Sequence, residues 1–194
     1  GTARKTLEQV MAWGLAVRRH GSGTYVAPHL DQPLSRLSCF SEEVQARGMQ
    51  SGSIWLFRDV ALCSSEELMH LGLQVGDKVA RLKRLRTADG VVMAIEYCRL
   101  PLAYLPDPAL IEDSLYDYLE QRGTPVVSAL QKIGAVNANT EQAQLLGIAL
   151  NTAVLFITRL GYDAMRQRME LTHSYCRPDY YDFVAELNRK SPHL

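Results

Sequence analysis

"SEELMHLGLQVGDKVARLKRLR", residues 65–86, has a second copy in the same chain, "TEQAQLLGIALNTAVLFITRLG" at residues 140–161. Six identical residues align at one constant offset of 75 positions. Each copy predicts a short capped helix that ends at a Leu-Gly pair, followed by a turn and a strand. The aligned pairs are Glu66 and Glu141, Leu71 and Leu146, Gly72 and Gly147, Val79 and Val154, Arg84 and Arg159, and Leu85 and Leu160.

A second strand is predicted after each copy of the repeat. These returning strands read "VVMAIEYCRLP" at residues 91–101 and "MELTHSYCRP" at residues 169–178. Two copies of helix, strand and strand predict a pseudo-symmetric antiparallel sheet covered by helices. The expected fold class is therefore α+β.

Each copy carries an arginine on its outgoing strand and a glutamate on its returning strand, Arg84 with Glu96 and Arg159 with Glu170. Cross-strand ion pairs on an exposed face are one explanation. A ligand site between the halves is the other, with arginine for an anionic group and glutamate for hydroxyls. Arg86 favours the ligand site, because it shares a sheet face with Arg84 and an anion between them would relieve their repulsion.

Two predicted helix starts add to this candidate anion site. Ser41 precedes "EEVQARG" as a plausible N-cap, and Ser114 and Tyr116 lie near the start of the helical pattern in "EDSLYDYLEQRG". Free N–H groups at helix starts favour phosphate, although each serine is also explained as an ordinary cap.

The N-terminal segment differs from the rest of the chain in charge. Residues 1–29 hold four cationic side chains and one acidic one, so they carry +3 and the remainder carries −3. "TARKTLEQVMAWGL" predicts an amphipathic helix, and the basic "RRHGSG" between "LAV" and "TYVA" predicts a tight hairpin. A helix with basic first turns followed by a basic hairpin is the arrangement of a DNA-binding winged helix. A solvated helix with an ordinary charged hairpin is the alternative.

The bulk composition suits one medium domain with a small appendage, since 47% of the 194 residues are hydrophobic. No apolar run is long enough to cross a bilayer and no signal-peptide pattern opens the chain, so we predict a soluble cytoplasmic protein. The four cysteines never form a C-x-x-C pair, and we predict no disulfide, no metal site and no cofactor.

The stretch "TARKTLEQVMAWGLAVRRHGSGTYVAP", residues 2–28, resembles the end of the DNA-binding domain of the GntR family of bacterial transcriptional repressors, so this part is expected at residues 1–27. The resemblance implies a partial winged helix-turn-helix, a recognition helix plus wing, from which the family's first helices are absent. It places DNA contacts on both parts. They are Thr2, Arg4 and Lys5 in the helix and Arg18, Arg19, His20, Gly21 and Gly23 in the wing.

A linker is expected at residues 28–37 because of its prolines, and the body is expected at residues 38–190. The order of "FSEEVQARG", "RLRTADGVVMAIEYCRLP", "DSLYDYLEQRG", "TEQAQLLGI" and "YCRPDYYDFV" resembles the UTRA effector-binding domain of the HutC branch of that family. This resemblance implies a chorismate-lyase-like fold, and within the branch it is strongest to repressors of amino-sugar use.

The resemblance also implies a site. A phosphate would be bound by Phe40, Ser41, Arg84, Arg86, Ser114 and Tyr116, and the sugar would be oriented by Glu96 and Glu170. A tyrosine of the amino-sugar repressors matches Cys176 here, and Tyr175 points to the other face. The expected effector is N-acetylglucosamine 6-phosphate or glucosamine 6-phosphate.

The predicted function is that of a repressor, homodimeric on palindromic operator DNA in the full-length protein, which its effector releases. A different metabolite as effector is the main alternative, and a chorismate-lyase-like enzyme is a distant one. No nucleophile elbow, phosphate-binding loop or metal-ligand spacing is present in the sequence, so we predict no enzyme activity.

Overall fold

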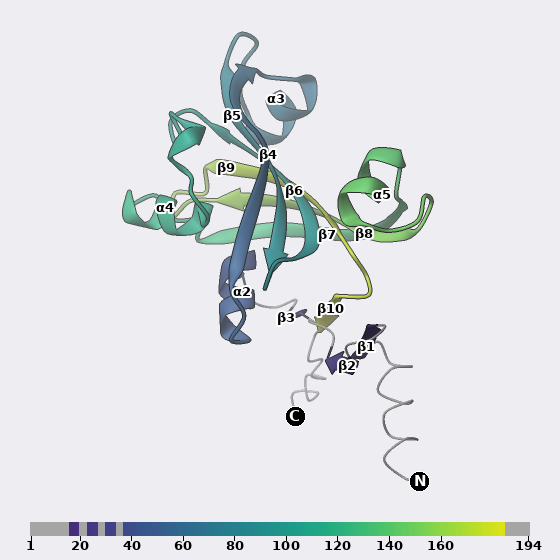
Figure 1. Cartoon of the computed structure of the whole chain (residues 1–194). Helices are drawn as coiled ribbons and strands as arrows, with labels where there is room; N and C mark the ends of the chain where they lie inside the picture. Colours follow the sequence, from purple (N-terminus) through teal and green to yellow (C-terminus); the bar gives the residue numbers. More distant parts are fainter. Residues whose placement is uncertain (1–15, 20–22, 27–29, 34–36, 185–194) are drawn as a thin grey trace, which may run out of the picture.

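The computed structural model describes residues 16–19, 23–26, 30–33 and 37–184. Its main element is a six-stranded antiparallel sheet in the order β4-β5-β6-β9-β8-β7 (Figure 1). The strands of this sheet are β4 Ser51–Leu62, β5 Lys78–Ala88, β6 Val91–Pro101, β7 Ser128–Asn137, β8 Ala153–Tyr162 and β9 Arg168–Cys176. The helices are α2 Phe40–Ala46, α3 Ser65–Leu71, the 3-10 turn η1 Pro108–Leu110, α4 Leu115–Gln121 and α5 Thr140–Leu146.

The repeat seen in the sequence extends over five elements in each half. Adding 75 to the residue numbers of α2 gives the residue numbers of α4. The same offset relates β4 to β7, α3 to α5, β5 to β8 and β6 to β9. The strand order places a pseudo-twofold axis between β6 and β9. The predicted α+β fold is confirmed, and the strands that begin each half's share of the sheet, β4 and β7, are an addition to the sequence prediction.

The helices of the repeat end where the Leu-Gly pairs predicted. Gly72 after α3 and Gly147 after α5 both adopt the left-handed conformation with φ 67°. Each helix begins with a capping box, Ser64 with Glu67 in α3 and Asn139 with Gln142 in α5. Both stop and start signals are therefore local, which is why the sequence alone located these helices.

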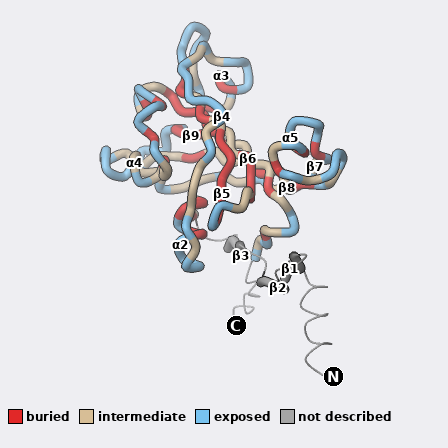
Figure 2. The backbone as a smooth tube through the Cα atoms, viewed as in Figure 1, coloured by how far each residue is buried: buried red, intermediate tan, exposed pale blue. Residues whose placement is uncertain are grey.

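The sheet buries both of its faces. Val44 of α2 and Leu119 of α4 pack against one face, in clusters with Ala94 and Leu82 respectively. The other face contacts Leu71 of α3, and Ala143 and Leu146 of α5 pack there with Leu85 and Ile95. Figure 2 shows the buried residues following the central strands. The core is thus a three-layer arrangement of helices, sheet and helices.

Two small pairings lie outside the main sheet. Strands β1 Ala16–Arg19 and β2 Gly23–Val26 form the predicted antiparallel hairpin, with Arg19 opposite Gly23. Strand β3 Leu30–Pro33 pairs in parallel with β10 Tyr181–Val184, and the two lie side by side near α2 in Figure 1. The segment expected to be a linker therefore contains a strand that pairs with the end of the body.

Most of the predicted DNA contacts fall outside the described residues: Thr2, Arg4, Lys5, His20 and Gly21. The backbones of Arg18, Arg19 and Gly23 lie in the hairpin. Within the described residues, the four cysteines are free, no cluster of three or more His, Cys, Asp or Glu side chains could hold a metal ion, and no helix is long and apolar enough to span a membrane.

Candidate functional site

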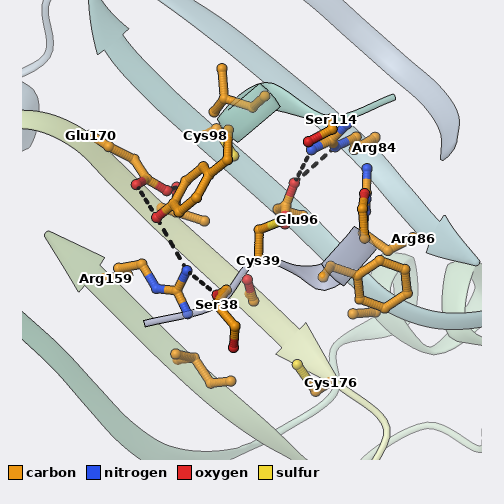
Figure 3. A pocket seen from close by; sticks show the side chains of 18 of the residues that line it. Ser38, Cys39, Arg84, Arg86, Glu96, Cys98, Ser114, Arg159, Glu170 and Cys176 are labelled. Atoms are coloured by element: carbon orange, nitrogen blue, oxygen red, sulfur yellow. Dashed lines mark hydrogen bonds and ion pairs between the residues drawn. The ribbon is translucent and has the colours of Figure 1, made fainter. Parts of the chain in front are cut away.

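One pocket opens on the sheet face that carries α2 and α4 (Figure 3). Strands β5, β6, β8 and β9 form its floor, and the first turns of α2 and α4 form its rim. All nine residues predicted for the effector line it. They are Phe40, Ser41, Arg84, Arg86, Glu96, Ser114, Tyr116, Glu170 and Cys176.

Arg84 and Glu96 are direct cross-strand neighbours on β5 and β6. The guanidinium Nε and Nη2 atoms of Arg84 lie 2.8 and 2.7 Å from the same carboxylate oxygen of Glu96 (Figure 3). Burial disfavours a charged carboxylate, but Arg84 and Arg86 outweigh it and lower the pKa of Glu96 to about 2. Because the Arg84 side chain is only 5% exposed, this pair lies inside the pocket and not on an exposed sheet surface.

Arg86 is the most deeply buried charged group of the pocket, with 1% of its surface exposed. Its Nη2 donates to Ser41 Oγ at 2.7 Å, its Nη1 donates to Ser53 Oγ at 2.7 Å, and its guanidinium lies 4.7 Å from the centre of the Phe40 ring. Its Nε has no hydrogen-bond partner among the described residues. Burial lowers the pKa of Arg86, yet a guanidinium stays protonated, so the site holds a buried positive charge whose countercharges are Glu96 and Asp113.

The prediction that Ser41 caps α2 is wrong. The helix begins at Phe40 with Cys39 as its N-cap, and the Cys39 N–H donates to the Glu42 carboxylate at 2.9 Å. Ser41 therefore lies inside the first turn, where its hydroxyl is free to accept from Arg86. The prediction for Ser114 is confirmed, since Ser114 is the N-cap of α4 and its Oγ accepts from the Asp117 N–H.

Arg159, which the repeat offered as one arginine of a ligand site but which the family resemblance did not include, lines the pocket. Its Nη1 donates to the Ser38 carbonyl at 3.0 Å and to the Tyr116 hydroxyl at 3.2 Å (Figure 3). Its Nε and Nη2 donate to Gln131. Burial disfavours its charge, but Tyr116 and Glu170 raise its pKa. Its alignment with Arg84 in the repeat was the available signal.

The expected pairing of Arg159 with Glu170 is indirect. Arg159 faces Thr172 across the strands, whereas Glu170 faces Gly161. The Tyr116 hydroxyl joins the two side chains, since it accepts from Arg159 and donates to Glu170 at 2.7 Å. Thr172 lies opposite Arg159 as Glu96 lies opposite Arg84, and Glu170 lies two residues nearer the hairpin between β8 and β9 than Thr172.

Glu170 is 2% exposed, and its two carboxylate oxygens accept from Tyr116 and Thr172. Burial raises its pKa. A methyl group on Gly161 would lie 2.8 Å from a Glu170 carboxylate oxygen, so a glycine is needed opposite this side chain. The repeat position that holds Arg86 in the first half therefore holds a glycine that admits Glu170 in the second.

Buried thiols and a tyrosine complete the wall near Cys176. Burial raises the pKa of Cys98 and of Cys176, so both thiols are neutral. Tyr175 lies on the opposite face of the sheet, where it stacks on Phe156 at 4.9 Å between ring centres. Tyr181 of β10 does line the pocket, and the sequence analysis did not name it because it lies beyond the repeat.

The family described as the UTRA domain matches residues 46–182. The chain belongs to the UTRA family. Its curated relatives include the HTH-type transcriptional repressor NagR of Bacillus subtilis (strain 168), which is 32% identical over 98% of this chain and 80% of its own length. The repressor PhnF of Mycolicibacterium smegmatis is 31% identical over 98% of this chain and 79% of its own length.

Solved structures agree with this assignment. The crystal structure of PhnF from Mycobacterium smegmatis matches with a TM-score of 0.80 and 28% identity, over 97% of this chain and 85% of that one. The ligand-binding domain of a GntR-family regulator from Bordetella bronchiseptica matches with a TM-score of 0.67 and 25% identity, over 72% and 91% of the two chains. This UTRA protein is thus a homologue of GntR-family transcriptional regulators.

The pocket of this UTRA domain has two chemically different halves. Arg84, Arg86 and the hydroxyl of Ser41 provide donors for an anion in one half, and both guanidiniums also donate to Ser53 Oγ. The other half, around Glu170, provides carboxylate, phenol, hydroxyl and amide groups, which suit the hydroxyls of a polar ligand. The residues of this second half are Tyr116, Gln131, Arg159, Glu170 and Thr172.

Proposed function

We propose that this protein is a cytoplasmic, homodimeric bacterial repressor whose pocket binds a phosphorylated amino sugar and thereby releases operator DNA. The proposed effectors are glucosamine 6-phosphate and N-acetylglucosamine 6-phosphate. Operator DNA is bound by the full-length protein through the recognition helix and wing. The similarity to transcriptional repressors supports the repressor class.

The observation that carries the choice of ligand is the concentration of buried positive charge at one end of the pocket. Arg84 and Arg86 both donate to Ser53 Oγ, so two guanidiniums converge on one point. Glu96 compensates Arg84, whereas Arg86 interacts with neutral hydroxyls and with the partly exposed Asp113 at 3.5 Å. A phosphate group, with three oxygens and up to two negative charges, matches this donor set.

The other half of the pocket supports a sugar attached to that phosphate. The wall of this half presents hydrogen-bond acceptors and donors from Glu170, Gln131 and Tyr116. Glu96 lies between the two halves. Hydroxyl groups pair with acceptors and donors of this kind, and a carboxylate also attracts a protonated amine. No catalysis is proposed, because the thiols are neutral and the carboxylates are held by arginine, tyrosine and threonine.

We propose that the effector releases DNA by changing the conformation of residues 38–41, which lead into α2. Arg159 donates to the Ser38 carbonyl and Arg86 donates to Ser41, so both cationic sites of the pocket hold this segment. A ligand that draws these arginines toward itself changes how residues 38–41 are held. An effector needs to favour one arrangement by only a few kcal/mol, roughly 1–3, to control DNA affinity.

The test is a calorimetric and thermal-shift titration with both phosphosugars, their unphosphorylated sugars and inorganic phosphate. We expect the phosphosugars to raise the melting temperature and the parent sugars to leave it nearly unchanged. Arg84→Gln is expected to weaken phosphosugar binding at least about tenfold, since a charge-assisted contact is worth roughly 1.5–3 kcal/mol. If phosphosugar and parent sugar bind equally, a different metabolite is the effector.

The matched control is Arg81→Gln. Arg81 lies on the same strand and is paired with Glu67 at 2.7 Å, but on the opposite face of the sheet. This variant loses a similar ion pair and should keep wild-type affinity. In the full-length protein, Arg19→Ala should weaken operator binding and leave effector affinity intact, whereas Arg84→Gln should do the reverse. Joint loss of both functions in folded protein would rule out separate DNA and effector sites.

A further inference from the structure

Asp113 accepts hydrogen bonds from the arginine and serine side chains that are proposed to bind phosphate. Its carboxylate accepts from Ser51 Oγ at 3.0 Å, from Ser53 Oγ at 3.1 Å and from Ser41 Oγ at 3.4 Å. The same carboxylate lies 3.5 Å from Arg86 Nη1. Three hydroxyls and a buried guanidinium are therefore directed at one carboxylate of the chain itself.

The main-chain carbonyl of Asp113 accepts from both arginines. The donors are Arg84 Nη1 and, at 3.0 Å, Arg86 Nη1. Both arginines of the proposed phosphate position are thus directed at one residue. The negative charge and oxygen atoms of Asp113 stand where a ligand anion would receive the same bonds.

The position of Asp113 in the fold allows a ligand anion to replace its carboxylate. Its side chain is 40% exposed, in contrast to 2% for that of Arg86, so it reaches Arg86 from the solvent side, and it lies next to Ser114, which lines the pocket. It lies in the short connection between η1 and α4, and Ser114 next to it is the N-cap of α4. Ile111 anchors this connection in the core, so a rotation of the Asp113 side chain, without a shift of Ile111, removes the carboxylate.

We propose that Asp113 is an internal ligand that occupies the anion position of the empty pocket and is displaced by the effector's anionic group. This inference rests on the proposed function, because it regulates the same pocket. Since each anion must first displace Asp113, its presence lowers the affinity for all anions by one common factor. Only a ligand with several strong contacts then binds, which keeps simple anions from acting as inducers.

Whether Asp113 variants bind anions more tightly or more weakly than wild type distinguishes this proposal from other roles of Asp113. Asp113→Asn and Asp113→Ser remove the competing charge, so both should bind glucosamine 6-phosphate and inorganic phosphate more tightly, by about tenfold. The affinity for unphosphorylated glucosamine should stay unchanged. An Asp113 that contacts the ligand directly, or that merely supports the fold, would give weaker binding in both variants.

Glu112→Gln is the matched control, because it removes one negative charge from the neighbouring exposed residue. Dissociation constants are measured by calorimetry at constant ionic strength, with circular dichroism to show that each variant is folded. Tighter binding in both Asp113 variants but not in Glu112→Gln supports the proposal. Affinities equal to those of Glu112→Gln, or weaker than wild type, overturn it.

The inorganic phosphate titration distinguishes failure of this inference from failure of the proposed effector. If no phosphosugar binds any variant, the amino-sugar assignment is wrong. The Asp113 variants must then still gain a larger thermal shift from inorganic phosphate than wild type and Glu112→Gln do. Equal phosphate shifts in all four proteins overturn the role of Asp113 whatever the natural effector is.

Discussion

At the scale of single residues, the pKa values of two glutamates in one pocket are shifted in opposite directions. Glu96 faces two guanidiniums, so its pKa falls to about 2 despite its burial. Glu170 is buried and accepts from a phenol and a hydroxyl, and its pKa is raised, because burial outweighs the attraction of Arg159. Charge partners, more than burial alone, decide which carboxyl group of this pocket is ionised.

The free energy of unfolding should therefore respond to pH differently in two variants. The native pKa of Glu96 lies below the unfolded value, so its contribution to stability is present above about pH 4.5 and is lost as the pH falls toward about 2. Glu96→Gln should be destabilised at neutral pH, and its difference from wild type should shrink across that window. Urea unfolding at a series of pH values measures this difference.

Glu170→Gln should show the opposite dependence. The native pKa of Glu170 lies above the unfolded value, so wild type loses stability relative to the variant as the pH rises from about 4.5 through the native pKa. Urea unfolding of wild type and Glu170→Gln at increasing pH measures this difference in the free energy of unfolding. Parallel curves for the two variants would contradict the assigned pKa directions.

At the scale of elements, the repeat relies on glycines that end its helices. Gly72 and Gly147 hold the same left-handed conformation at matching positions, and each lets the next strand start in the same direction. Gly147 has nothing within 4 Å of an added methyl group, so crowding plays no part there and the requirement for glycine is purely one of backbone conformation.

Gly147→Ala should lower the free energy of unfolding by about 1 kcal/mol, because an alanine is strained at positive φ. Chemical denaturation measures the change. Gly134→Ala is the control, since Gly134 lies in β7 without positive φ and its added methyl group would meet only the Phe156 carbonyl oxygen at 3.9 Å. We expect the control to retain or slightly exceed wild-type stability. Equal losses at both sites would refute a conformational role for Gly147.

At the scale of the whole molecule, the pocket spans both halves of the pseudo-symmetric sheet. Arg84 and Arg159 occupy equivalent positions, but Arg86 corresponds to Gly161, and this difference makes one half cationic and gives the other a carboxyl group. The pocket also touches the ends of the body, since Tyr181 of β10 lines it and β10 pairs with β3. Six residues, 34–39, lie between β3 and α2 in the chain, so β3 is connected to the pocket both through β10 and through α2.

Ligand binding should therefore slow amide hydrogen exchange in residues 38–41 and in the paired strands β3 and β10. Helices α3 and α5 cover the opposite face and should exchange at unchanged rates. Mass spectrometry of peptides with and without glucosamine 6-phosphate measures both sets. Slowing confined to β5, β6, β8 and β9 would show that the pocket is not coupled to the N-terminal segment.

Sequence patterns located the local features of this protein well. Capping boxes and Leu-Gly ends fixed α3 and α5, the shared offset of the repeat gave the paired strands, and the family resemblance gathered nine residues that the structure brings to one pocket. These signals are short-range or repeated, and side-chain alternation in a strand follows directly from backbone geometry. The hairpin at β1 and β2 is of the same kind.

Only the tertiary structure decided which of these groups contact each other. Strand register separated Arg159 from Glu170 and placed Tyr116 between them, and the N-cap of α2 is Cys39, two residues before the predicted Ser41. Asp113 reaches Arg86 across 27 positions of the chain, a contact that no local pattern encodes. The sequence by itself determined the repeat, the fold class and the chemistry available to the pocket. Packing and register determined its partners, because they depend on long-range distances that residue spacing does not specify.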